Sequence, residues 1–450
     1  MPTSEELAQW DRQHCWHAFT QMAEYKSLIV ERAEGVWLYD TQGRRFLDGV
    51  SSMWCNLLGH CHPTINAAIG EQLRNVSHNT SLGMGNSTTS TLAKRLADLA
   101  PGDLQHVFFA SDGSSAIEAA LKMAFQYWQQ CDSPRPKKTK YLALGQAYHG
   151  DTLGSASVGG IPRFHALFAP LLFEVIRVPS PDCRQEAQVY LDELEQTLAE
   201  HHEEIAAMVL EPLVQAAAGI VFHRPGYLAG VRELTRRYDV FLITDEIVTG
   251  FGRTGHMFAC EAEDVVPDFL CLGKSLTGGY LPLSATITHP DIYAGFLGSA
   301  TSGRALMHGH TYAGNPLAAA ASLATLDVLE QEQTIETLPA KFEILAEVLE
   351  RLSNHPRVAV TRQLGLIAAV ELTPTDESHE RYPAELRIAY EICDATLSRG
   401  VWLRPLGDVI VIMPPLTITA EELRFLGDVL LESIEEVTSA ISTAKPVERS

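Results

Sequence analysis

Short runs of apolar residues alternate with longer helical patterns through the middle of the chain. HVFFA at 106–110 predicts a buried strand, and the mostly apolar segment 114–130 predicts a largely buried helix behind it. Strands that are apolar on both faces and alternate with helices indicate a parallel sheet covered on both sides. Further predicted strands are YLALG (141–145), IAAMVLEP (205–212), VFLITDE (240–246) and FLCLG (269–273), with helical stretches at 190–201 and 227–238.

The pattern changes in the last third of the chain. From Asn315 it is helical for roughly 35 residues with one break, and afterwards short strands and two helices mix. This predicts a small α+β unit beside a larger α/β unit. The predicted elements there are strands in VAVTRQ (358–363), GLIAAVEL (365–372), VWLRPLG (401–407) and VIVIMPP (409–415), a helix at 384–399 and a last helix from about 420.

These patterns divide the chain into three parts. We expect a large domain at 56–330 with a mainly parallel sheet, a small C-terminal domain at 331–450, and an N-terminal segment at 1–55 that packs on the small domain.

Composition narrows the class of protein. The 450 residues are 46% apolar and 20% charged, and 34 Lys and Arg against 56 Asp and Glu give a net charge of −22. So acidic a chain without a basic cluster is a poor binder of nucleic acids or anionic membranes. It contains no apolar run near the roughly 18 residues of a membrane helix, no signal-peptide core and no CxxC pair. We expect a soluble cytoplasmic protein with free thiols and neither a nucleic-acid nor a membrane partner.

A GxGxxG motif at Gly250–Gly255 follows the predicted strand 240–246 and is compatible with a dinucleotide site in a dehydrogenase. Two carboxylates at the end of that strand, Asp245 and Glu246, disfavour a pyrophosphate there, and the next segment is a weak helix start. The dehydrogenase remains a distant alternative.

Three other features point to a phosphate-bearing cofactor with a reactive carbonyl. Gly113 and Ser114 begin a helix after a strand, which suits a phosphate, although an ordinary N-cap is the simpler interpretation. Lys274 ends a strand among small and apolar residues, and partial burial makes its amine nucleophilic, although a surface lysine is the commoner case. Asp245 ends another strand, where a carboxylate can pair with a protonated pyridine nitrogen, unless it caps a helix or pairs with Arg253.

A helix start suited to phosphate, a strand-end aspartate and a strand-end lysine follow one another in this order along the chain. Together they suggest a site for pyridoxal phosphate. The segment FLITDEIVTGFGRTG (241–255), followed by LCLGKSLTGG (270–279), resembles the class III (ω-type) aminotransferases of the type I pyridoxal-phosphate fold. The resemblance runs from about residue 14 to about residue 435. It implies an aminotransferase, and it makes the GxGxxG part of a signature loop.

The resemblance also assigns roles to residues. Lys274 is the Schiff-base lysine and proton shuttle, Asp245 pairs with the pyridine nitrogen, and Tyr148 and Ile247 cover the two faces of the ring. Thr311, with Gly309 and His310 beside it, is expected to reach the phosphate of a neighbouring subunit, which makes a homodimer obligatory. The other residues that it assigns are Gly113 and Ser114 on the phosphate, Glu211 beside the cofactor, and Phe19, Met53, Trp54, Tyr148, Gly309 and Arg404 around the substrates.

Further stretches resemble the members of this family that act in biotin biosynthesis and aminate 8-amino-7-oxononanoate. Among them are VSSMWCNLLGHCHP (50–63) and MHGHTYAGNPLA (307–318), and Arg404 is expected to hold the carboxylate of the oxo-acid. Members that use S-adenosylmethionine carry Tyr or an aromatic residue where this chain has Phe19, Met53 and Val411. The amino donor is therefore S-adenosylmethionine or, nearly equally, L-lysine.

Alternatives stay open within and outside this family. A broad ω-transaminase and an aminomutase use the same cofactor. The HxH pairs His60/His62 and His308/His310 could bind a metal, but neither has Cys or carboxylate ligands at a clear spacing, so we expect no metal site.

Overall fold

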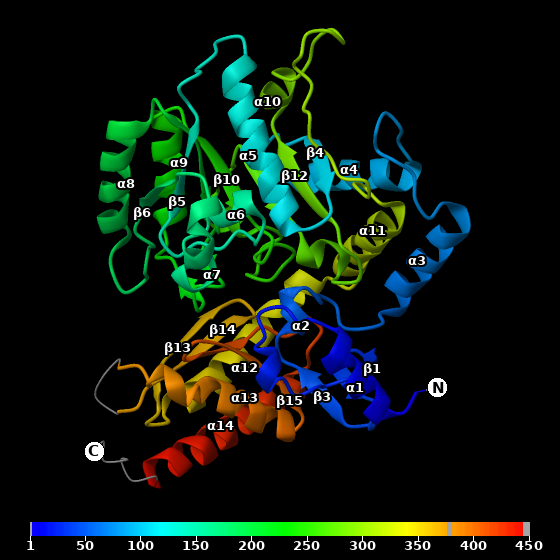
Figure 1. Cartoon of the computed structure of the whole chain (residues 1–450), viewed down its shortest axis with the longest axis vertical. Coiled ribbons are helices and arrows are strands. Elements are labelled where there is room, and N and C mark those ends of the chain that lie inside the picture. Colours follow the sequence, from blue (N-terminus) through cyan, green and yellow to red (C-terminus); the bar gives the residue numbers. More distant parts are fainter. Residues whose placement is uncertain (1, 376–379, 444–450) are drawn as a thin grey trace.

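A seven-stranded sheet forms the centre of the large upper lobe in the computed structural model, which describes residues 2–375 and 380–443 (Figure 1). Its strand order is β4-β12-β11-β10-β7-β5-β6. Every neighbouring pair is parallel except those of β12, which runs antiparallel to β11 and β4. The strands are β4 (His106–Ala110), β5 (Lys140–Leu144), β6 (Ile176–Val178), β7 (Ile205–Leu210), β10 (Phe241–Asp245), β11 (Phe269–Leu272) and β12 (Ser284–Thr288).

Both faces of this sheet are covered, as predicted. Ala207 and Val209 of β7 belong to the apolar cluster under helix α5, whereas Met208 and Leu210 belong to the larger cluster on the opposite face. Successive side chains of a strand point to opposite faces, so a strand buried on both sides is apolar throughout. The helices of this lobe are α3 (Pro63–Asn75), α4 (Ser87–Leu99), α5 (Gly113–Gln130), α6 (Leu153–Val158), α7 (Pro162–His165), α8 (Ala187–His201), α9 (Tyr227–Arg237), α10 (Pro290–Ala294) and α11 (Pro316–Gln331).

The lower lobe contains a four-stranded antiparallel sheet with the order β13-β14-β17-β16, and α12, α13 and α14 pack around it (Figure 1). Its elements are α12 (Thr334–Ser353), β13 (Val358–Leu364), β14 (Ile367–Leu372), α13 (Ile388–Ser398), β16 (Arg404–Leu406), β17 (Val409–Ile412) and α14 (Ala420–Thr443). The helix predicted at 384–399 begins only at Ile388, because Arg387 has a positive φ of 46° that separates it from the short 3-10 turn η5 (Ala384–Leu386).

The two ends of the chain meet in a third sheet, β1-β2-β3-β15. Strand β3 pairs in parallel with β15, so Leu47 lies opposite Val401. Figure 1 shows the blue N-terminal elements beside the orange and red C-terminal ones. The elements are α1 (Ser4–His14), η1 (Met22–Glu24), β1 (Val30–Glu34), β2 (Trp37–Asp40), β3 (Arg45–Asp48), α2 (Ser51–Trp54) and β15 (Val401–Trp402). The exact boundaries at 55 and 330 stay predictions.

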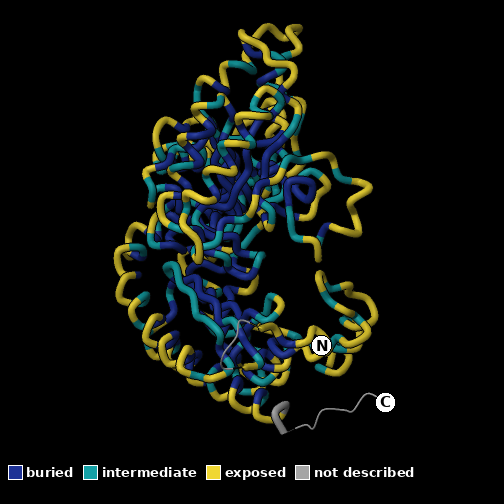
Figure 2. The backbone as a smooth tube through the Cα atoms, turned by 90° about the vertical axis from the view of Figure 1, so that its left-hand side faces the viewer, coloured by how far each residue is buried: buried dark blue, intermediate teal, exposed yellow. Residues whose placement is uncertain are grey.

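Buried backbone runs through the middle of both lobes, and exposed backbone follows the outer helices and loops (Figure 2). All eight cysteines are described and carry free thiols. Within residues 2–375 and 380–443, no helix is long and apolar enough to cross a membrane. The remaining short elements are β8 (Val214–Gln215), β9 (Val221–Phe222), η2 (Ala166–Leu171), η3 (Ala259–Glu263) and η4 (Lys274–Thr277).

Candidate active site

A cavity of about 410 Å³ lies beyond the carboxyl ends of β7, β10 and β11, next to the start of α5. In sheets with parallel strands, ligands bind at this edge because the loops that follow the strands converge there. The residues that line it include Trp54, Ser114, Tyr148, Glu211, Asp245 and Lys274. Together with Gly113 and Ile247, eight of the predicted site residues thus line one cavity, and they come from segments up to 220 residues apart.

Lys274 is the first residue of η4, directly after β11 and Gly273. Its φ of 42° lies in the left-handed region, which is unfavourable for a residue with a Cβ and typical of functional sites. Its Nζ lies 5.5 Å from the centre of the Trp54 ring, and burial lowers the pKa of the amine, against the opposing effect of Asp245. A lowered pKa increases the fraction of neutral, nucleophilic amine.

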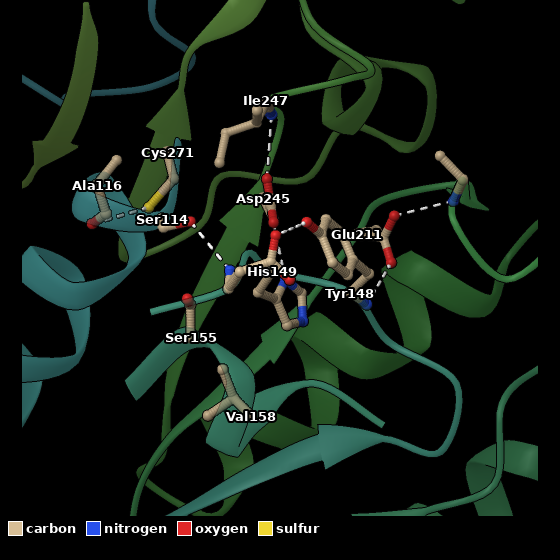
Figure 3. Close-up of polar contacts among 12 residues, drawn as sticks. Ser114, Ala116, Tyr148, His149, Ser155, Val158, Glu211, Asp245, Ile247 and Cys271 are labelled. Carbon is tan, nitrogen blue, oxygen red and sulfur yellow. Dashed lines mark hydrogen bonds and ion pairs between the residues drawn. The ribbon is translucent and has the colours of Figure 1, made fainter. Parts of the chain in front are cut away.

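Asp245 ends β10 and is 5% exposed. Its Oδ1 accepts a hydrogen bond from the Ile247 N–H at 3.1 Å, and its Oδ2 lies 2.7 Å from His149 Nδ1 (Figure 3). An ionised carboxylate can only accept, so Nδ1 carries the ring proton and donates it. The two hydrogen bonds fix the position of this buried carboxylate at the cavity, where a protonated ring nitrogen could pair with it.

His149 is a residue that the sequence analysis missed. It follows Tyr148 in the loop after β5, and β5 and β10 both flank β7. One signal in the sequence for His149 is its position just beyond a predicted strand, at the same edge of the sheet as Asp245. The sequence does not show which of the neighbouring side chains Tyr148 and His149 turns toward that carboxylate.

Glu211 connects two walls of the cavity. It is buried beyond the end of β7 and accepts hydrogen bonds from the Tyr148 N–H at 3.1 Å and the Ala216 N–H at 2.9 Å. Burial raises its pKa to about 7. The Tyr148 hydroxyl donates to Asp151 Oδ2 at 2.7 Å (Figure 3). Hydrogen bonds therefore fix Tyr148 both at its backbone N–H and at the hydroxyl of its ring.

The start of α5 has the features of a phosphate site. Ser114 Oγ accepts from the Asp151 N–H at 3.3 Å, which leaves its own O–H available to an anion. A Cβ on Gly150 would lie 1.9 Å from that Oγ, and one on Gly113 would lie 2.8 Å from Ile247. The helix is capped by Asp112, which accepts from the Ser115 N–H at 3.0 Å. The ordinary N-cap is therefore present, and Gly113 and Ser114 remain beside the cavity.

The residues present fit pyridoxal phosphate. An amine, a buried carboxylate and a helix start with a free hydroxyl line one cavity, and Tyr148 and Ile247 line it as well. These are the donors and acceptors that a cofactor with a carbonyl, a pyridine nitrogen and a phosphate requires.

The predicted substrate wall is less regular. Ser51, Ser52 and Trp54 have positive φ values of 49°, 60° and 61°. Trp54 is buried, whereas Met53 is 40% exposed. Phe19, which is 56% exposed, lies 5.4 Å from Phe164 between ring centres, and Phe164 contacts Tyr148. Neither Phe19 nor Met53 lines the cavity, and ring contacts connect Phe19 through Phe164 to Tyr148, which does.

Several predicted site residues do not line this cavity. Arg404 is half-buried on β16, opposite the buried Val411, and no described residue forms a hydrogen bond or ion pair with its guanidinium. Gly309 and Thr311 are exposed and His310 is half-buried, in the segment before α11. His308 and His310 contact each other edge to face, 5.2 Å apart between ring centres.

The GxGxxG segment forms no helix start of the dinucleotide-binding kind. It leads into the five-residue 3-10 helix η3, and Arg253 within it is fully buried. Arg253 does not pair with Asp245. It donates to the carbonyl of Pro414 in the small lobe and, at 3.4 Å, to Ser51 Oγ of the N-terminal segment.

The His60/His62 pair is engaged elsewhere. His60 contacts Asp48 at 3.0 Å and Asn56 at 3.0 Å, and His62 lies 3.6 Å from Glu332. In the part of the chain that the structure describes, no group of three His, Cys, Asp or Glu side chains is arranged to hold a metal ion.

Comparison with known proteins agrees with this geometry. The family model of the class-III aminotransferases matches residues 20–435. An adenosylmethionine-8-amino-7-oxononanoate aminotransferase of Geobacter sulfurreducens is 44% identical, over 97% of this chain and 98% of the relative. A protein of Aquifex aeolicus with the same name is also 44% identical, over 97% and 98%.

Solved structures give the same picture. The adenosylmethionine-8-amino-7-oxononanoate aminotransferase of Methanocaldococcus jannaschii superimposes with a TM-score of 0.92 at 41% identity, over 96% of this chain and 99% of the other. The ω-transaminase of Pseudomonas jessenii, solved in complex with PMP, has a TM-score of 0.92 at 29% identity, over 97% and 99%.

Proposed function

The chain belongs to the class-III aminotransferases and uses pyridoxal phosphate, and we propose that it transfers an amino group to 8-amino-7-oxononanoate to form 7,8-diaminononanoate. The observation that carries this proposal is the whole-length identity of 44% to relatives named for that reaction. The cavity with Lys274 and Asp245 supports it, because both groups required for amino transfer face the same space.

Each residue has a task that follows from its position. Bound pyridoxal phosphate accepts an amino group from one substrate, passes it to the next and withdraws electrons into its ring. Lys274 Nζ moves the proton at the substrate carbon that carries nitrogen, and its lowered pKa suits a general base. Asp245 holds the proton on the ring nitrogen, and the hydrogen bond with His149 fixes the position of its carboxylate.

Gly113 and Ser114 bind the phosphate, while Tyr148 and Ile247 cover the ring and orient it. Glu211 holds the backbone of Tyr148 in place. The water-excluding wall opposite Lys274 is Trp54, whose ring lies 5.5 Å from Nζ. Met53 and Phe19 extend this wall toward solvent.

Arg404 binds the carboxylate of the oxo-acid. Its guanidinium is half-buried without a described partner, and burying a charge is costly unless an opposite charge compensates it. A substrate carboxylate supplies that charge in a bidentate geometry.

We further propose a homodimer in which Gly309, His310 and Thr311 complete the partner's phosphate site. None of these three residues lines the active-site cavity of its own chain, and Gly309 and Thr311 are exposed. The test combines Lys274→Ala and Thr311→Ala subunits, each of which should be weak alone. In the mixed dimer one site receives both intact residues, so activity should reappear. Failure of complementation between two folded variants contradicts the shared site.

The amino donor is S-adenosylmethionine in this proposal, as in the names of the relatives. The decisive experiment mixes the cofactor-loaded enzyme with S-adenosylmethionine, L-lysine or a simple amine under single-turnover conditions. Oxo-acid is then added, and 7,8-diaminononanoate is measured by mass spectrometry. If only L-lysine gives the absorbance change and the product, the assignment of S-adenosylmethionine as the amino donor is wrong. Reaction with simple amines and simple ketones, but not with 8-amino-7-oxononanoate, would favour the ω-transaminase function.

A further inference from the structure

One wall of the cavity is a short hairpin that the proposed mechanism does not use. The hairpin runs from β8 to β9, over residues 214–222, and its Ala216 and Ala217 line the cavity. Its turn is closed by the Ile220 N–H, which donates to the Ala216 carbonyl at 3.0 Å. Gly219 and Ile220 have positive φ values of 99° and 57°. A non-glycine residue in that region persists only where its surroundings hold it.

The residue that holds this turn comes from the other lobe. Arg362 on β13 donates from Nε to the Ile220 carbonyl at 3.2 Å and from Nη2 to the Gly219 carbonyl at 3.0 Å. Its remaining nitrogen, Nη1, forms an ion pair with Glu371 on β14, and both side chains are 18% exposed. The planar guanidinium therefore contacts two consecutive carbonyls and one carboxylate at once.

The turn is also connected to the cofactor wall. The Ala216 N–H donates to Glu211 Oε2 at 2.9 Å, and the other oxygen of Glu211 accepts from the Tyr148 N–H at 3.1 Å. A continuous set of hydrogen bonds thus runs from Arg362 in the small lobe, through the hairpin and Glu211, to the backbone of the aromatic residue that faces the cavity.

We propose that Arg362 is a positioning residue for the substrate wall and for Tyr148. It fixes the hairpin at residues 216–220 in its strained conformation and so sets the distance between Ala216–Ala217 and the ring of Tyr148. The expected kinetic consequence of this inference rests on the proposed function. The structural part, that Arg362 orders the hairpin, is independent of it.

The most informative variant is Arg362→Lys. An ammonium retains the ion pair with Glu371, which protects the fold, but it lacks the fork that reaches two carbonyls. We expect faster hydrogen exchange of the amides in residues 214–222, a changed circular dichroism of the bound cofactor, and a KM for the oxo-acid raised about tenfold, with kcat within about twofold. Arg362→Met should give larger changes of the same kind in hydrogen exchange, cofactor spectrum and KM.

The matched control is Arg351→Lys. Arg351 lies in the same lobe and forms an ion pair with Asp428, with both side chains about half exposed. It should leave hydrogen exchange at 214–222, the cofactor spectrum and KM unchanged. A merely structural Arg362 would lower the melting temperature without a selective change at the hairpin or in KM.

The outcomes separate this inference from the proposed function. Wild-type exchange, spectrum and KM in the folded Arg362→Lys protein would overturn the positioning role. If the wild-type enzyme forms no 7,8-diaminononanoate, but exchange at 214–222 rises in Arg362→Lys and not in Arg351→Lys, the proposed function fails while the positioning role stands.

Discussion

The two sides of the active-site cavity are built in different ways. On the cofactor side, Asp245 ends β10, Lys274 closely follows the adjacent strand β11, and Ser114 lies at the start of α5. On the substrate side, Trp54 comes from the N-terminal segment and Ala216 and Ala217 come from the hairpin at 214–222, which Arg362 of the small lobe contacts. In these segments Ser52, Trp54 and Ile220 have positive φ values, as Lys274 has on the cofactor side.

This difference shows which interactions position the residues on each side of the cavity. A parallel sheet aligns the ends of its strands, so the cofactor residues converge because of regular backbone hydrogen bonds. The substrate wall depends on individual long-range contacts, such as those of Arg362 with the hairpin and of Arg253 with Pro414. Substitutions on the first side should therefore stop the chemistry, and those on the second should change substrate binding.

The largest expected effect is that of Lys274→Ala. Loss of the nucleophile and proton shuttle should lower kcat by at least about 10⁴-fold, while the cofactor still binds non-covalently. Borohydride reduction of the wild-type enzyme, followed by peptide mapping, should attach the cofactor to Lys274. The control Lys94→Ala changes a surface lysine that pairs with Asp98 and should keep full activity. Label on another lysine would contradict the assignment.

Asp245→Asn should have the next largest effect. The amide still accepts from Ile247, so the protein should stay folded, but it cannot hold a proton on the ring nitrogen. We expect kcat to fall about 10²- to 10³-fold, an effect of the size of a lost proton-transfer group. Turnover and the cofactor spectrum measure it. Near-normal turnover would show that the cofactor side does not depend on this carboxylate.

Arg404→Ala tests the substrate side. Loss of a charge-assisted bidentate pair, worth about 1.5–3 kcal/mol, should raise the KM for the oxo-acid by roughly 10- to 150-fold. The KM for the amino donor should change much less. Steady-state kinetics with each substrate varied in turn gives both values. An equal increase in KM for the two substrates would assign Arg404 a shared structural role and remove the contrast between the two sides of the cavity.

The smallest expected effect concerns stability and pH at Glu211. Burial raises its pKa from the ordinary 4.5 to about 7. Between these values the folded protein binds more protons than the unfolded chain. The contribution of Glu211 to stability is therefore complete below about pH 4.5 and is lost as the pH rises through 7. Glu211→Gln lacks this dependence.

Denaturant unfolding of both proteins without cofactor measures the difference. The stability of the wild type relative to Glu211→Gln should fall between pH 4.5 and 7 and stay constant above that range. Parallel profiles for the two proteins would show that Glu211 stays ionised throughout and serves only as a hydrogen-bond acceptor.

The residues that the sequence assigned to the cofactor side lie around one cavity for a definite reason. Strands apolar on both faces and the residues at their ends are local patterns, so Lys274 and Asp245 could be identified before their positions were known. Strand β12 was not anticipated. It runs antiparallel and interrupts the parallel order, and a five-residue segment contains no information about its direction. The roles of Arg404, Thr311 and the other assigned residues remain predictions.

By itself, the sequence determined the fold class, the family and the chemical identity of the residues at the strand ends. Only the tertiary structure decided that His149 rather than Tyr148 contacts Asp245, that Arg253 binds backbone carbonyl and hydroxyl groups of distant segments, and that Arg362 reaches across to the hairpin. The physical reason is that hydrophobic periodicity encodes burial, whereas the direction of a hydrogen bond between residues 96 to 161 positions apart is fixed only when both segments are packed.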